Sequence, residues 1–101
     1  MYRGRGTKDL NHDVIVKALE EIGCSVVDLY RLGSGVPDLM VGYMGMTLLM
    51  EIKNPGTQYG REGLNRNQVL WKEQWKGGPY AVVIDVESAL RAVRAMCNSA
   101  K

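Results

Sequence analysis

The stretch from Asp38 to Lys53 constrains the fold more than any other part of the chain. Two mostly apolar runs, 38–43 and 47–53, are separated only by Met44-Gly45-Met46. Two such runs around a tight connection that contains glycine indicate a β-hairpin. Asn54-Pro55-Gly56 follows at once and must end the second strand. The rest of the chain therefore has to be built around a sheet.

The remaining elements are short and clearly punctuated by glycine and proline. Between residues 10 and 22 the apolar side chains have helical spacing, and they predict one buried stripe, made by Leu10, Val14, Ile15, Ala18, Leu19 and Ile22. Further along we expect a strand over 25–30, a loop over 54–64, a helix over 65–76, a strand over 80–85 buried on both faces, and a helix over 86–97. The order α-β-β-β-α-β-α predicts an α/β fold with a mixed four-stranded sheet flanked by helices.

Size and composition limit what else the chain can carry. Its 101 residues suffice for a flexible basic arm over 1–8 and a single domain over 9–101, without a nucleotide-binding domain or nucleotide cofactor. The net charge of +2 permits a nucleic-acid partner without requiring one. Cys24, Cys97 and the single histidine His12 lack zinc-site spacing, so we expect reduced thiols and a cytoplasmic protein. No apolar run approaches the roughly 20 residues of a membrane span.

Charged residues gather at one end of the predicted hairpin. Side chains alternate along a strand, so Glu51 and Lys53 share one face, opposite the apolar face made by Leu48, Met50 and Ile52. A two-residue turn places Asp38 opposite Glu51, and a four-residue connection places it opposite Lys53. A three-residue connection turns Asp38 to the other face.

Two carboxylates that converge in this way repel, and each raises the pKa of the other unless a cation binds. Oxygen ligands from Asp38 and Glu51, with the backbone carbonyl of Ile52 as a third, suit Mg²⁺ or Mn²⁺ better than zinc. Lys53 then stands where it can hold a water or stabilise charge on a phosphate. The alternative is an ordinary surface ion pair, worth under about 1 kcal/mol.

Three segments together resemble a known family. Gly35-Val36-Pro37-Asp38, then Glu51-Ile52-Lys53, then Gln68 and Trp71 are similar to the motifs of the VRR-NUC family of virus-type replication and repair nucleases, within the PD-(D/E)XK superfamily. The resemblance covers roughly residues 9 to 90. It implies a restriction-endonuclease-like core and metal-dependent phosphodiester hydrolysis. Asp38, Glu51 and the Ile52 carbonyl would be metal ligands, Lys53 would position the attacking water, and Gln68 would reach into the site.

Some residues keep two interpretations. Gln68 is also three residues after Asn65, as in a helix capping pair. Family members often carry an acidic residue on the first helix, but here the predicted buried stripe centres on Asn11, while Glu20 points away. Asn11 is therefore the candidate for that role and favours one principal ion; alternatively it caps the helix. Trp71 and Trp75 recur at helical spacing and are expected in the core.

The resemblance points to a Mg²⁺- or Mn²⁺-dependent endodeoxyribonuclease. Without a base-reading module, branched or junction DNA is the expected substrate. Phosphate contacts would come from Arg3, Arg5, Arg61 and Arg66. Cutting two strands needs two sites, which predicts a homodimer. The alternatives are a non-catalytic nucleic-acid-binding module on the same fold and a small protein-interaction domain in which Asp38, Glu51 and Lys53 form only an ion pair.

Overall fold

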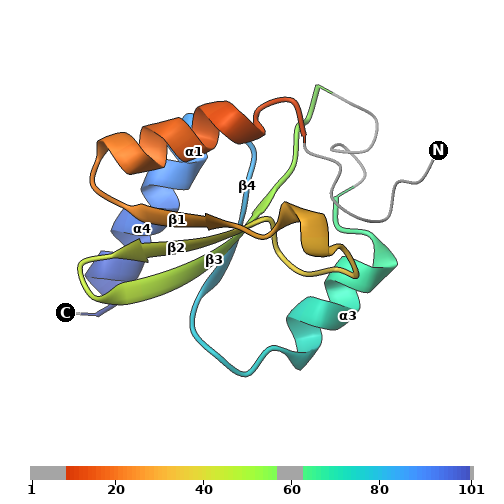
Figure 1. Cartoon of the computed structure of the whole chain (residues 1–101). Helices are drawn as coiled ribbons and strands as arrows, with labels where there is room; N and C mark the ends of the chain where they lie inside the picture. Colours follow the sequence, from red (N-terminus) through yellow and green to blue (C-terminus); the bar gives the residue numbers. More distant parts are fainter. Residues whose placement is uncertain (1–8, 57–62, 101) are drawn as a thin grey trace.

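A computed structural model of the chain describes residues 9–56 and 63–100. The predicted phosphate contacts Arg3, Arg5 and Arg61 lie outside these residues. Along the described chain, the predicted order of helices and strands is confirmed, with one added 3-10 turn (Figure 1). The elements are α1 (His12–Glu21), β1 (Ser25–Asp28), η1 (Tyr30–Leu32), β2 (Leu39–Tyr43), β3 (Met46–Ile52), α3 (Arg66–Gln74), β4 (Tyr80–Val83) and α4 (Val86–Ser99).

The four strands form one mixed sheet in the order β1-β2-β3-β4. The first three make an antiparallel meander, and β4 lies parallel to β3. The hairpin between β2 and β3 turns through Met44 and Gly45, whose φ angles of 52° and 81° are those of a type I′ turn. This two-residue turn pairs Tyr43 with Met46 and Leu39 with Met50. The register that brings Asp38 opposite Glu51 is therefore the one the fold adopts.

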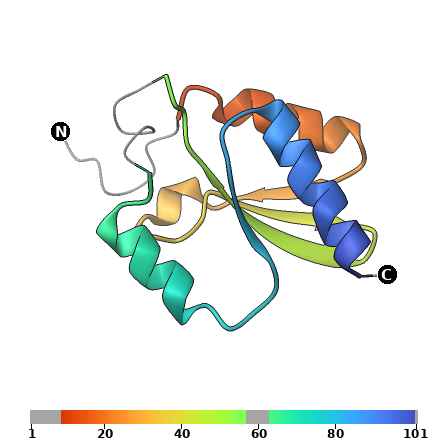
Figure 2. The ribbon, with the colours of Figure 1, turned by 180° about the vertical axis from the view of Figure 1, so that it is seen from behind.

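The two faces of the sheet have different coverings. Helices α1 and α4 pack against each other and against the sheet on one side, whereas α3 lies on the other side (Figures 1 and 2). The covered face contains the hydrophobic core, to which β3 contributes Leu48, Met50 and Ile52 as predicted. Leu49 is also buried but lies outside that core, because its side chain points to the α3 side.

The buried stripe of α1 differs from the predicted one. Leu10 precedes the helix and is 83% exposed, and Val14 is also exposed. Ile15 and Leu19 are buried as predicted, and the third buried position is His12. His12 is three residues before Ile15 and so lies on the same helical face. The predicted centre of the buried stripe at Asn11 was wrong, because the stripe was defined by apolar residues alone and the buried side chain of His12 shifts it.

Two expectations about β4 and α3 were also wrong. β4 is an edge strand, and the side chain of Val82 is exposed, so β4 is not buried on both faces. Helix α3 has no buried residue, and Trp75 is 41% exposed, so Trp71 and Trp75 are not core residues. The two indole rings stack on each other instead, with centroids 5.0 Å apart. Within the described ranges, no helix is long and apolar enough to cross a membrane.

Candidate active site

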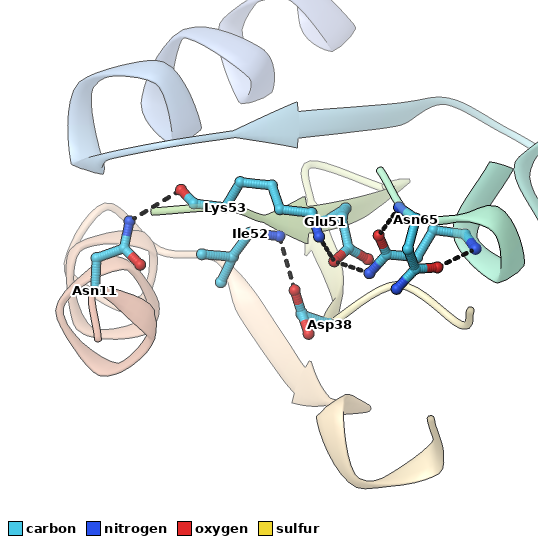
Figure 3. A network of polar contacts seen from close by, with 7 residues as sticks. Asn11, Asp38, Glu51, Ile52, Lys53 and Asn65 are labelled. Atoms are coloured by element: carbon cyan, nitrogen blue, oxygen red, sulfur yellow. Dashed lines mark hydrogen bonds and ion pairs between the residues drawn. The ribbon is translucent and has the colours of Figure 1, made fainter. Parts of the chain in front are cut away.

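Asp38, Glu51 and Lys53 meet at the end of the β2–β3 hairpin (Figure 3). Asp38 directly precedes β2, and the register that pairs Leu39 with Met50 continues to bring it opposite Glu51. Glu51 is only 2% exposed. The Lys53 side chain is 12% exposed, and its Nζ lies 4.0 Å from Glu51 Oε2. Because Glu51 is buried and the Lys53 side chain is largely shielded from water, the pair is not an exposed surface ion pair.

The backbone of Ile52 faces Asp38. Its N–H donates to Asp38 Oδ2 over 2.7 Å (Figure 3). The N–H and C=O of one strand residue point to the same side, so the Ile52 carbonyl is also directed toward Asp38. The backbone groups of residues 51 and 53 point the other way, toward β4. The hydrogen bond from Lys53 N–H to the Val83 carbonyl shows this direction. The hairpin thus brings two carboxylates and one carbonyl to one place.

The electrostatics of the pair follow from its burial. Burial, and then the negative charge of Asp38, raise the pKa of Glu51 to about 9. Burial also raises the pKa of Asp38, although the hydrogen bond from Ile52 opposes this shift. Burial therefore contributes more than the repulsion predicted from the sequence. The charge of Lys53 opposes this rise in the pKa of Glu51, and a bound cation would favour the ionised form further.

Gln68 performs both of the roles open to it. Its backbone N–H donates to Asn65 Oδ1, and its side-chain Oε1 accepts from Asn65 N–H, which forms a capping box at the start of α3. Its Nε2 donates to Glu51 Oε2 over 2.8 Å (Figure 3). The cap therefore fixes the rotamer that reaches the site. Arg66, the first residue of α3, is exposed beside this cap.

Gly35 allows α3 to approach the loop before Asp38. Its φ is +84°, and an added Cβ would lie only 2.3 Å from the Asn67 carbonyl oxygen. A side chain at this position would therefore push the first turn of α3 away and separate Gln68 from Glu51. The Gly-Val-Pro-Asp segment thus positions the helix as well as the carboxylate.

Asn11 stands at the N-cap position of α1, but its side chain makes no capping bond. Its Nδ2 donates to the carbonyls of Ile84, over 2.6 Å, and Lys53, over 3.4 Å, at the ends of β4 and β3 (Figure 3). Asn11 therefore links the start of α1 to the strand that carries the site. Its Oδ1 is buried and has no hydrogen-bond partner among the described residues.

The sequence reasoning missed Asp9. Burial, and then the negative charge of Asp38, raise the pKa of Asp9, and the charge of Lys53 opposes this shift. Asp9 is thus the acidic residue from the α1 side that lies near the pair. The expected acidic residue was placed within the first helix, whereas Asp9 lies three residues before α1 begins. The sequence indicated this acid only by its position two residues before Asn11.

His12 was also missed as part of this region. Its Nε2 pairs with Asp28 Oδ1 at the end of β1, and its ring meets Tyr30 edge-on, with centroids 5.3 Å apart. This places His12 close enough to Asp38 and Asp9 to oppose the burial-driven rise in the pKa of both carboxyl groups. The contact between His12 and Asp28 connects α1 to the end of β1 next to the site.

The donor set fits a hard divalent cation. Glu51 Oε1 is buried and accepts no hydrogen bond within the described chain. In its protonated form Glu51 hydrogen-bonds Asp38, so an ion would take the place of that proton. With Asp38 and the Ile52 carbonyl it would supply three oxygen ligands, which suits a partly hydrated Mg²⁺ or Mn²⁺. Within 9–56 and 63–100, no group of three or more His, Cys, Asp or Glu side chains forms a metal-binding cluster.

Comparison with known proteins adds no relative. No family model, curated protein or solved structure matches the chain. The geometry of the site and its resemblance to the nuclease motifs are therefore what indicate a function.

Proposed function

We propose that this chain is a Mg²⁺- or Mn²⁺-dependent endodeoxyribonuclease with a restriction-endonuclease-like core. One observation carries the proposal: a buried glutamate, a half-buried aspartate and a largely shielded lysine converge on one hairpin end. Such a cluster is unfavourable without a ligand, because a buried carboxylate without a full set of partners loses its hydration. A cation that bridges a phosphate would compensate for this cost.

The residues have separate roles in this proposal. Asp38, Glu51 and the Ile52 carbonyl hold the ion, which would polarise a phosphodiester oxygen and a water. Lys53 orients that water and balances charge on the phosphate. Gln68 holds Glu51 through Oε2, and Asn11 holds the backbone of Lys53. Asp9 is an acid at the rim that could bind an ion through water.

Branched DNA, such as a four-way junction, is the proposed substrate. Contacts from Arg66 and other arginines to phosphates would position DNA but would not select a sequence. A junction needs two cuts, so we propose that the chain acts as a homodimer in which each copy supplies one site.

The first test is cleavage of labelled junction, flap and duplex DNA in Mn²⁺. We expect Lys53→Ala to lose roughly 100-fold or more in rate, as when a charge-stabilising donor is removed from an active site. Lys17→Ala removes an exposed lysine on α1 and should cleave like the wild type. Equal rates for all three proteins would refute the role of Lys53, and no metal-dependent cleavage of any substrate would refute the nuclease.

The second test measures the ion without DNA. Calorimetry with Mn²⁺ should show binding by the wild type and a loss of at least tenfold in affinity for Asp38→Ala, because one of three protein ligands is gone. Asp13→Ala, an acid on the exposed side of α1, is the control and should bind normally. Undiminished binding by Asp38→Ala would remove Asp38 from the ligand set.

A further inference from the structure

Tyr80, the first residue of β4, has a buried hydroxyl that the described chain does not satisfy. Four buried side-chain polar atoms within the described ranges have no hydrogen-bond partner: Asn11 Oδ1, His12 Nδ1, Glu51 Oε1 and Tyr80 Oη. An orphaned buried polar atom costs free energy, so few are retained in a folded protein without reason. Glu51 already belongs to the candidate site, and Tyr80 has no role in the mechanism proposed above.

The sheet places the Tyr80 side chain on the same face as Glu51. Tyr80 pairs with Leu49 across the parallel β3–β4 ladder, and Glu51 is two residues further along β3. Residues that are paired, or two apart on one strand, project from the same face. The Cα atoms of Tyr80 and Glu51 are therefore roughly 8 Å apart, which is within the reach of an aromatic side chain.

Helix α3 fixes the ring of Tyr80. The Trp71 ring lies against it with centroids 6.3 Å apart, and Lys72 Nζ lies 5.4 Å from the centroid of the phenol. Trp71 comes one turn after Gln68, whose side chain bonds Glu51 Oε2. The same helix therefore holds Gln68 against one oxygen of Glu51 and covers the phenol of Tyr80. The charges of Glu51 and Asp38, after burial, raise the pKa of the Tyr80 hydroxyl, which agrees with a position close to both.

We propose that Tyr80 is a positioning residue of the cation site and acts on Glu51 through one water molecule. The hydroxyl donates to this water, and the water donates to Glu51 Oε1, so that both orphaned atoms gain a partner. With Gln68 on Oε2, the carboxylate is then held from two sides, and a lone pair of Oε1 remains for the ion. The inference rests on the proposed function, because it assigns Tyr80 to the ion that Glu51 would bind.

The test uses Tyr80→Phe, which keeps the ring and removes only the hydroxyl. We expect the melting temperature without ions to be unchanged, since the contacts of the ring with Trp71 and Lys72 remain. The Mn²⁺ affinity, followed by calorimetry and by the ion-induced rise in melting temperature, should fall 10- to 100-fold, as for other groups that orient a metal ligand. Tyr43→Phe, at the far end of β2, makes the same chemical change and should alter neither value.

The possible outcomes distinguish a positioning role of the Tyr80 hydroxyl from a role in packing or folding, and from a failure of the proposed function. Wild-type affinity in Tyr80→Phe, with a loss only in Tyr80→Leu, would show that the ring packs and that the hydroxyl does not position Glu51, which overturns the inference. A lower melting temperature of ion-free Tyr80→Phe would show that the hydroxyl serves folding, and would overturn it as well. Absence of Mn²⁺ binding in the wild type would instead refute the proposed function itself.

Discussion

The two faces of the sheet have different physical roles. Under α1 and α4 the strands bury a continuous apolar core, and the buried polar side chain of His12 lies at its margin. On the other face, α3 has no buried residue of its own and meets the sheet through Gln68 and through Trp71 on Tyr80. The apolar core is therefore concentrated on one side, and the carboxylate pair and the Tyr80 hydroxyl lie on the other.

This division explains how a small domain tolerates a costly site. The buried carboxyl group of Glu51, beside the half-buried Asp38, lowers the stability of the ion-free protein. The opposite face compensates with close-packed side chains, so the site face need not contribute to the core. The following predictions test whether the two faces are as different in energy as they are in structure.

The largest expected difference is between two leucines. Leu19 on α1 is fully buried, whereas Leu70 on α3 is 43% exposed. Leu19→Ala should lower the free energy of unfolding by about 2–5 kcal/mol, because it leaves a cavity in the core. Leu70→Ala should lower it by less than about 1 kcal/mol. Urea denaturation measures both, and similar losses would show that α3 shares in the core.

The next effect concerns pH. The folded-state pKa of Glu51, about 9, exceeds its ordinary value of 4.5. Between these values the folded state binds more protons than the unfolded state, so the free energy of unfolding should fall as pH rises through this window, by up to about 1.4 kcal/mol per pH unit. The raised pKa of Asp38 acts in the same direction. Glu51→Gln should flatten this dependence.

Melting temperatures from pH 5 to 9 in the presence of a chelator would measure the effect. Glu20→Gln, an exposed change on α1, is the control and should keep the wild-type slope. A wild-type protein whose stability rises over this range would contradict the raised pKa of Glu51.

A smaller effect is expected at the cap of α3. Asn65→Ala removes one half of the capping box and should destabilise this helix by about 1 kcal/mol. Because α3 contributes little to the core, its amides should exchange with solvent several-fold faster while those of β3 remain protected. Hydrogen exchange followed by mass spectrometry can separate the two. Asn67→Ala, inside the same helix, keeps the cap and should not accelerate exchange.

The smallest effect is expected on the solvent side of α4. Arg91 and Glu87 form an ion pair 3.7 Å apart, and both side chains are exposed. Arg91→Gln should change the free energy of unfolding by less than about 0.5 kcal/mol, because water and salt screen such a pair. A loss above 1 kcal/mol in urea denaturation would indicate that this surface is covered.

Much of this arrangement could be predicted from local sequence. The hairpin could be predicted, but its connection could have two, three or four residues. The structure selects the two-residue turn at Met44-Gly45, and this register brings Asp38 to Glu51. The capping role of Gln68 was visible from its spacing to Asn65, and its place in the site was expected from the resemblance to the nuclease motifs. The failures share one physical cause, which is that burial depends on partners far away in the sequence. His12 is buried because Asp28 pairs with it, and Trp71 and Trp75 stack on each other outside the core.

The parallel pairing of β4 with β3 has a consequence for the route of folding. The hairpin closes through two residues, whereas β4 reaches β3 only after the whole segment 53–79, and longer closures cost more entropy and form more slowly. Asp38 and Glu51 therefore meet early, while Gln68 and Tyr80 arrive with the last elements. A partly folded chain would carry the acidic pair without the groups that orient it, so binding competence should appear only at the final stage of folding.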